Sequence, residues 1–192
     1  MSTRPRTSAA TNDLTIYQSV FDNLKLALAS DTIWLNGILE AKMSGSTIKD
    51  FSYMLKDMDG NGIQELFLYD GGSKLLIAVF TIANNKVELL QEFWSKNSGY
   101  LTVNDQILTD WTNGTDNSRV SVFSFANMVT ATFLIQVDGY EVRTDEKGTV
   151  SYIKFDYTGE NEDILMNSAE LDTFNKNPNY MENKNLHLLQ IP

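Results

Sequence analysis

Apolar residues recur at intervals of three and four along the first part of the chain. This spacing places them on one side of an α-helix that begins after a capping residue at Asn12 or Asp13. A helix with one apolar face needs a partner surface, so we expect this helix to cover a sheet. The predicted apolar face consists of Leu14, Tyr17, Phe21, Leu24 and Leu28.

Capping residues predict two further helices. One begins behind Ser30-Asp31 and extends to about Met43, although Gly37 lies inside it and lowers its helix propensity. The other occupies residues 167–176, near the C-terminus, where the sequence Asn-Ser-Ala-Glu resembles a capping box. The chain is therefore helical at its beginning and again, briefly, towards its end.

From Phe51 the period of the sequence changes to two, because Phe51, Tyr53 and Leu55 alternate with Ser52, Met54 and Lys56, and this predicts a strand. This strand leads into a loop, and Glu65 to Tyr69 forms the returning strand. Almost continuously apolar stretches at Leu75 to Ile82 and Val129 to Val137 indicate strands in the middle of a sheet. Turns are predicted at Asp70-Gly71-Gly72, Asn84-Asn85, Asn104-Asp105, Asn113-Gly114, Asp138-Gly139 and Lys147-Gly148.

Sequential hairpins indicate an antiparallel meander. Together with the helices, they predict an α+β fold in which one or two N-terminal helices pack on a twisted antiparallel sheet of about seven to nine strands. Residues 13–44 would form the helical part, residues 51–157 the sheet, and residues 167–176 a short C-terminal helix. Residues 1–12 are polar and are predicted to be a disordered leader or an artificial extension, which makes 13–192 a single domain.

Between the first two predicted strands, oxygen-bearing side chains follow one another at regular spacing. Counted from Asp57, they occupy positions one, three, five and nine, with Gly62 at position six. A hard cation such as Ca²⁺ needs several oxygen ligands, and a loop this tight needs a residue that tolerates a positive φ. The sequence therefore predicts a structural calcium site at the tip of a β-hairpin. Its side-chain ligands would be Asp57, Asp59, Asn61 and Glu65.

The same residues have a second interpretation, a glycine-rich turn in which the aspartates bond neighbouring amides. Leu68 stands at position twelve, where an EF-hand requires a bidentate Glu, so an EF-hand is not expected. Three crowded carboxylates would repel one another without a counter-charge, which favours a bound cation. Extracellular sites of this kind bind calcium at about 10⁻⁴ to 10⁻³ M, so such a site would fill outside the cell and stay empty in cytosol.

Residues 53–66, with the sequence YMLKDMDGNGIQEL, resemble a segment of secreted proteins and lipoproteins of Firmicutes. Their loop is also similar to integrin-type and FG-GAP or VCBS-type calcium loops. The resemblance implies that the backbone carbonyl of Ile63 joins the four side chains as a ligand. It also implies a place outside the cell or on the surface of a Gram-positive bacterium, with a signal segment and a lipid anchor as features of a full-length precursor. Integrin-type loops usually carry Asp where this chain has Glu65, so Glu65 is either a direct ligand or a cap for backbone amides.

Composition narrows the possible partners. The net charge of −10 argues against nucleic acid, because binding a polyphosphate depends on clustered Lys and Arg. The chain has no cysteine, which excludes disulfides, thiol catalysis and cysteine metal sites. No apolar run approaches the roughly 20 residues of a membrane-spanning helix, so no transmembrane segment is predicted.

The sequence contains no recognisable nucleophile motif, so it does not indicate a particular reaction. His187, the only histidine, is interpreted as an exposed or packed residue of the C-terminal segment rather than part of a catalytic triad. We therefore expect a non-enzymatic extracellular or cell-envelope module that binds a protein partner. One alternative is a carboxylate-dependent hydrolase of extracellular glycans. Another is a glycan-binding module in which Trp94, Trp111 and Tyr100 stack on sugar rings, although packing in the core or at its rim also explains these aromatic side chains.

Overall fold

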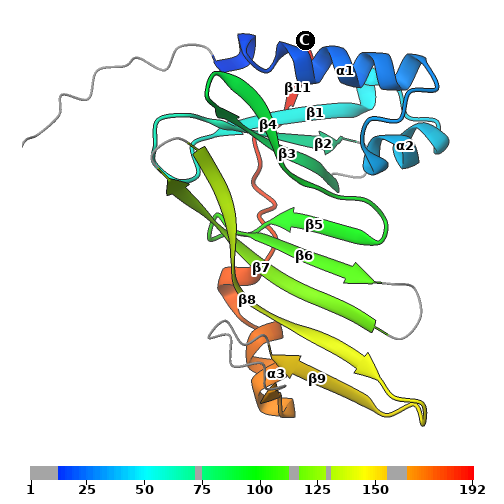
Figure 1. Cartoon of the computed structure of the whole chain (residues 1–192), viewed down its shortest axis with the longest axis vertical. Helices are drawn as coiled ribbons and strands as arrows, with labels where there is room; N and C mark the ends of the chain where they lie inside the picture. Colours follow the sequence, from blue (N-terminus) through cyan, green and yellow to red (C-terminus); the bar gives the residue numbers. More distant parts are fainter. Residues whose placement is uncertain (1–12, 72–74, 113–116, 129–130, 155–163) are drawn as a thin grey trace, which may run out of the picture.

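The computed structural model describes residues 13–71, 75–112, 117–128, 131–154 and 164–192. The predicted leader, residues 1–12, and the turn predicted at Asn113-Gly114 lie outside the described residues. Within them, three α-helices and eleven strands in two antiparallel sheets confirm the predicted α+β class (Figure 1). Strands β1 to β9 lie between residues 51 and 154, as predicted, and two strands of two residues each lie beyond the expected bounds of the sheet.

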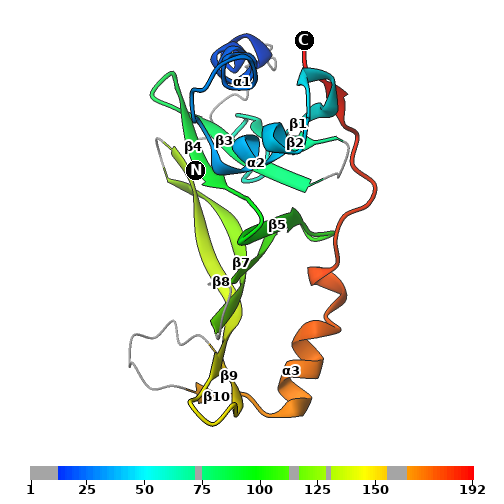
Figure 2. The same cartoon turned by 90° about the vertical axis from the view of Figure 1, so that its right-hand side faces the viewer.

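The first sheet lies at the top of Figure 1 and has the strand order β11-β1-β2-β3-β4. Four of its strands follow one another as a meander, as predicted, and the fifth comes from the C-terminal segment, which runs up the side of the molecule to reach β1 (Figure 2). Its strands are β1 (Phe51–Lys56), β2 (Glu65–Asp70), β3 (Leu75–Ala83), β4 (Lys86–Glu92) and β11 (Leu189–Gln190).

The second sheet continues the meander below the first and has the order β10-β9-β8-β7-β6-β5. Helix α3 (Ser168–Asn175) packs on one face of it through Phe174, whose ring lies 5.1 Å from that of Tyr140. The Asn167 side chain caps this helix by accepting from the amides of Ala169 and Glu170, as the capping box predicted. The strands are β5 (Asn97–Leu101), β6 (Ile107–Thr112), β7 (Asn117–Met128), β8 (Ala131–Thr144), β9 (Val150–Lys154) and β10 (Ile164–Leu165).

Helices α1 (Gln18–Ala29) and α2 (Asn36–Met43) cover the first sheet, but both begin later than predicted. A short 3₁₀ turn at Asp13–Thr15 precedes α1, and Tyr17 occupies its N-cap position. Ser30 does not start a helix because it ends one: its amide and its hydroxyl both donate to the carbonyl of Leu26. The buried face of α1 nevertheless includes the predicted Tyr17, Phe21 and Leu24, none of which has measurable exposure.

Gly37 has a packing role that explains a glycine inside α2. A Cβ atom at this position would lie 2.3 Å from the carbonyl oxygen of Phe93 and 3.3 Å from two methyl groups of Ile77. No side chain fits at 2.3 Å, so only glycine lets α2 lie this close to Phe93, which follows β4, and to Ile77 of β3. Gly37 therefore lowers the helix propensity of α2 but allows the helix to approach the sheet closely.

A shared apolar cluster joins the two sheets. Phe67 of the first sheet and Phe125 of the second have ring centroids 5.9 Å apart, within the range of favourable aromatic pairs. The fully buried Ile107 and the nearly buried Leu76 belong to the same cluster. Since both sheets contribute to it, separating them would expose apolar surface.

Two strand predictions need correction. Asp138-Gly139 is not a turn but part of the long strand β8, where Asp138 pairs with Val122 and Gln136 pairs with Phe123. The residue between them, Val137, has no counterpart on β7, so a β-bulge occupies the place of the predicted turn. The positive φ of Gly139, 146°, belongs to this distortion. In the described part of the apolar stretch that ends at Val137, residues 134–137, Ile135 and Val137 are exposed, so this part is not in the middle of a buried sheet.

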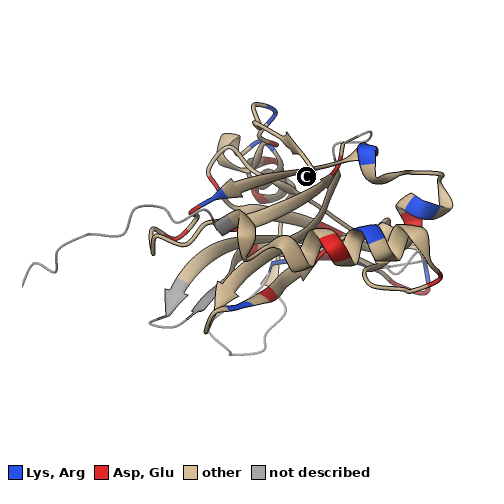
Figure 3. Ribbon diagram, turned by 90° about the horizontal axis from the view of Figure 1, so that it is seen from above, with Lys and Arg blue, Asp and Glu red and all other residues tan. Residues whose placement is uncertain are grey.

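No helix within the described residues is long and apolar enough to cross a membrane. Lys and Arg residues are dispersed among Asp and Glu over the described elements rather than gathered on one of them (Figure 3).

Candidate functional site

The loop predicted to bind calcium lies at the tip of the β1–β2 hairpin. Lys56 ends β1 and faces Glu65, the first residue of β2, in the strand ladder. Gly60 and Gly62 have φ angles of 73° and 89°, in the left-handed region that glycine tolerates best. The two glycines therefore allow residues 57–64 to curl tightly, as the sequence predicted.

Asp57 and Asp59 bond to the backbone of this loop. The amides of Gly60 and Gly62 donate to the two carboxylate oxygens of Asp57, at 2.8 and 2.9 Å. Asp59 accepts from the backbone amide of Asn61 at 3.0 Å and from its side-chain amide at 3.1 Å. These bonds fit the turn interpretation. A carboxylate oxygen that accepts one hydrogen bond still has a second lone pair, so they are also compatible with a metal ligand.

Asn61 and Ile63 fix the second half of the loop. The side-chain oxygen of Asn61 accepts from the amide of Ile63 at 2.6 Å. The Ile63 side chain packs against the main apolar cluster under α1 and α2. Ile63 thus anchors the loop to the core.

Glu65 is fully buried, with no measurable exposure. Its Oε2 atom accepts from the amide of Met58 at 2.9 Å, and its Oε1 atom accepts from the Thr81 hydroxyl at 3.1 Å. Of the two roles predicted for it, capping of a backbone amide is therefore present. A buried carboxylate is costly unless donors or a cation compensate for its charge.

The three acidic side chains of the loop converge. One carboxylate oxygen from each of Asp57, Asp59 and Glu65 lies within 4.8 Å of the other two. A calcium ion bonded at about 2.3 to 2.6 Å can join oxygens up to about 5 Å apart, so these separations suit a single ion. Glu65 is the buried first residue of β2, whereas the two aspartates lie half-buried in the loop at the hairpin tip.

The aromatic residues considered for glycan binding have different surroundings. Tyr100 is half-buried, and its hydroxyl donates to the carbonyl of Tyr180 at 3.1 Å. Trp94 is half-buried beside α2. Trp111 is 39% exposed and lines a groove together with Arg119 and polar side chains of both sheets. His187 is exposed in the C-terminal segment, which is one of the two situations predicted for it.

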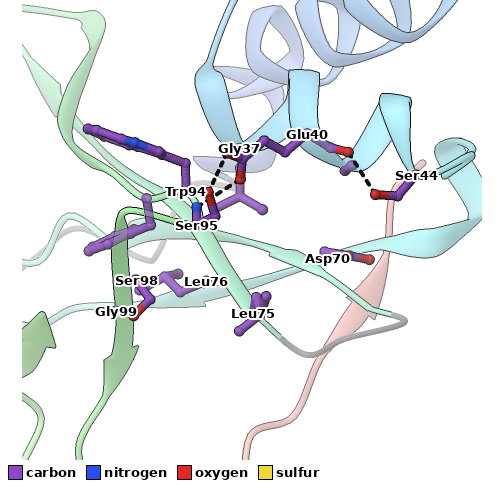
Figure 4. A pocket seen from close by; sticks show the side chains of 13 residues that line it. Gly37, Glu40, Ser44, Asp70, Leu75, Leu76, Trp94, Ser95, Ser98 and Gly99 are labelled. Atoms are coloured by element: carbon purple, nitrogen blue, oxygen red, sulfur yellow. Dashed lines mark hydrogen bonds between the residues drawn. The ribbon is translucent and has the colours of Figure 1, made fainter. Parts of the chain in front are cut away.

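Sequence reasoning missed a cavity of about 350 Å³ between α2 and the strands β3 and β5 (Figure 4). Its walls are mainly apolar, while Glu40 and Asp70 are the acidic residues of its lining. The Glu40 carboxylate accepts from the amide of Ser95 at 2.8 Å and from its hydroxyl at 2.7 Å. Since Glu40 and Ser95 are 55 positions apart, no local pattern could have indicated that they meet.

Comparisons with protein-family models, with curated proteins and with solved structures gave no match. The function therefore has to be inferred from the residues of this chain.

Proposed function

We propose that this protein is a non-enzymatic extracellular or cell-envelope module that is braced by calcium at the β1–β2 loop and binds a protein partner. The observation that carries the proposal is the convergence of Asp57, Asp59 and Glu65, whose oxygens lie within 4.8 Å of one another. The role of the ion is structural. The ion would connect the loop at the hairpin tip to Glu65, the buried first residue of β2.

The burial of Glu65 supports a cation at this place. A fully buried carboxylate next to two further carboxylates is unfavourable, because the desolvation of the charge adds to the repulsion between like charges. A divalent cation offsets both effects at once. The ligands would be Asp57, Asp59, Asn61, Glu65 and the backbone carbonyl of Ile63, with Glu65 retaining its bond to the Met58 amide.

The expected affinity supports an extracellular setting. Loops of this kind in extracellular modules bind calcium with dissociation constants of about 10⁻⁴ to 10⁻³ M. At the millimolar calcium level outside cells, such a site is about half to nine-tenths occupied. The resemblance of residues 53–66 to secreted proteins and lipoproteins of Firmicutes leads to the same location.

An exposed apolar groove between α1 and α2 supports a protein partner. Met43 is 81% exposed and Ile33 is 68% exposed, and both line a cavity of about 370 Å³ whose wall includes Trp34. Trp34 in turn stacks on Phe80 at a centroid distance of 5.9 Å, so the wall is fixed to the sheet. Exposed apolar side chains on a rigid frame are typical of protein interfaces.

Trp111 favours one alternative, a glycan-binding module. Its exposed indole lines the groove with Gln91, Gln136 and Thr109, whose polar side chains could bond sugar hydroxyls. The other alternative, a carboxylate-dependent glycan hydrolase, stays a prediction. It requires a pair of carboxyl groups about 5 to 9.5 Å apart on either side of the scissile bond.

The proposal is tested by the thermal midpoint of unfolding in millimolar calcium and in excess chelator. At 1 mM, calcium is at about one to ten times the expected dissociation constant, so the native state gains about 0.4 to 1.4 kcal/mol. For a chain of this size that corresponds to a rise of roughly 1 to 5 °C. Asp59→Ala should abolish the rise, because it removes one ligand. Asp22→Asn, which removes the same charge from the exposed face of α1, should keep it.

A wild-type protein whose midpoint is the same in calcium and in chelator would overturn the calcium brace and leave the loop as a tight turn. A rise that persists in Asp59→Ala would place the calcium elsewhere. The partner surface is tested separately by Met43→Glu, which should abolish pull-down of the partner from cell-envelope extracts without changing the calcium response.

A further inference from the structure

The cavity beside α2 is a second site, separate from the calcium loop. It opens between α2, the start of β3 and the start of β5, and has a volume of about 350 Å³ (Figure 4). Small-molecule sites in proteins have volumes of about 300 to 1,000 Å³ and combine apolar walls with a few polar groups. Of the cavity's acidic residues, Asp70 ends β2 at the end opposite Glu65, so the two sites lie at different ends of the strand.

Two glycines and one phenylalanine shape this cavity. The carbonyl of Phe93 lies against Gly37, and its ring lies against Gly99, where an added Cβ would be 2.4 Å from the ring. Phe93 is itself buried, and its amide donates to the carbonyl of Ile77 at 2.8 Å. Helix α2, β3 and β5 thus all contact one residue, Phe93. The cavity between them is therefore part of the rigid frame of the fold.

The wall of the cavity is apolar. It is formed by side chains from α2, β3 and the segment between β4 and β5, which Figure 4 shows around the opening. Such a wall favours the burial of an aliphatic or aromatic group, which gains free energy in proportion to the apolar area removed from water. The apolar lining consists of Ala41, Leu75, Leu76, Ile77, Phe93 and Trp94.

The charged residues among the described lining are both acidic. Glu40 and Asp70 belong to it, and no Lys, Arg or His occurs among the described residues that line the cavity. Ser95 holds the Glu40 carboxylate in place through two hydrogen bonds, of 2.8 and 2.7 Å. Both donors are neutral, so they orient the carboxylate without cancelling its charge. The hydroxyls of Ser44 and Ser98 are further polar groups in the lining.

We propose that this cavity binds a small organic cation, a primary amine carried on an aromatic or aliphatic body. The body would occupy the apolar wall, and the ammonium group would lie near Glu40 and Asp70, with serine hydroxyls as further acceptors. A carboxylate of the same shape would be repelled by the Glu40 carboxylate, and a neutral alcohol would gain only the apolar contacts. The lining thus selects for charge as well as for size.

The test is isothermal titration calorimetry at low ionic strength with three ligands of one shape: 2-phenylethylamine, 2-phenylethanol and 3-phenylpropionate. The amine should bind at least about tenfold more tightly than the carboxylate, with the alcohol between them. Glu40→Gln and Asp70→Asn should each weaken binding of the amine about fivefold and leave the alcohol unchanged. Glu88→Gln removes the same charge from an exposed position on β4 and should change neither.

Ser98→Trp tests the position of the site. Ser98 is exposed on β5, so the larger side chain can be accepted without disturbing the core, and it would fill the mouth of the cavity. This variant should bind neither the amine nor the alcohol. Binding of the amine at full strength in Ser98→Trp would overturn the proposal, and so would equal binding of amine and carboxylate, or no binding of any ligand at about 10 mM.

The titrations should be run with calcium and with chelator at a temperature where the protein is folded in both. Because no residue of the calcium loop lines the cavity, the affinity for the amine should be the same in each. Loss of the calcium response with amine binding intact would count against the calcium brace alone. A calcium response without amine binding would count against the cavity proposal alone.

Discussion

The hydroxyl of Thr81 donates to the Oε1 atom of Glu65 at 3.1 Å, and neither residue has any exposure to solvent. The same carboxylate accepts from the amide of Met58 in the loop. Glu65 therefore connects the hairpin tip to β3. The loop is held by the interior of the sheet as well as by its own turn bonds.

This connection can be measured by a double-mutant cycle. Thr81→Val removes a buried hydrogen bond to a charged group and should lower the free energy of unfolding by roughly 2 kcal/mol. Glu65→Ala should cost roughly 3 kcal/mol, because it leaves the Met58 amide without this acceptor and creates a cavity. Together the two changes should cost less than their sum, by about 1 kcal/mol or more. Additive effects in urea denaturation would contradict the coupling.

Gly37→Ala should destabilise the protein although alanine is the better helix former. The new methyl group would lie 2.3 Å from the Phe93 carbonyl, so helix and sheet must move apart, at a cost of roughly 1 to 3 kcal/mol. Asn23→Ala on the exposed face of α1 provides the control and should be neutral or slightly stabilising. If Gly37→Ala raised the midpoint of urea unfolding, the close packing of α2 on the sheet would be wrong.

Tyr69→Phe should stabilise the protein. Tyr69 is 2% exposed, and its hydroxyl has no hydrogen-bond partner among the described residues, so the folded state carries the desolvation cost of that group. Burial, with a smaller effect of the Glu182 charge, also raises the pKa of Tyr69. Removing the hydroxyl should raise the free energy of unfolding by about 1 kcal/mol.

Tyr100→Phe is the matched control for this change. The Tyr100 hydroxyl donates to the carbonyl of Tyr180 at 3.1 Å, so its removal should lower the free energy of unfolding by about 1 kcal/mol. Chemical denaturation of both variants at pH 7 measures whether each change raises or lowers the free energy of unfolding. A loss of stability in Tyr69→Phe equal to that in Tyr100→Phe would show that the Tyr69 hydroxyl is satisfied.

Glu141 should make the protein sensitive to acid. The hydrogen bond from Arg143 holds the pKa of Glu141 below its ordinary value of 4.5 despite partial burial, and Arg119 on the neighbouring strand β7 contributes to this effect. The pKa of Glu141 is therefore higher in the unfolded state than in the folded state. The stabilisation that ionised Glu141 provides is complete above the unfolded-state pKa and is lost as the pH falls through the folded-state pKa. Between about pH 5 and pH 3, wild type should lose more stability than Glu141→Gln.

Denaturation midpoints measured across that range, with Glu88→Gln as the exposed control, test this difference. The control should lose stability in parallel with wild type. Parallel curves for wild type and Glu141→Gln would show that the arginine contacts do not persist in solution.

The local features of this protein were predictable because their causes are local. The alternation from Phe51 predicted β1, and the glycines and aspartates that follow predicted a tight loop before β2, since turn chemistry depends on neighbouring residues. The apolar face of α1 followed from its periodicity. The first residues of α1 and α2 did not, because Asp13 and Ser30 can each lie at the start of a helix, at its end or in a turn.

Features that depend on distant residues were decided by the tertiary structure alone. The contact of Gly37 with Phe93, the bond between Glu65 and Thr81, and the bulge at Val137 arise only when strands and helices are placed against one another. The division into two sheets and the cavity beside α2 have the same origin. Sequence periodicity determines which face of an element is apolar, whereas the surface that covers that face depends on side-chain shapes brought together from far along the chain.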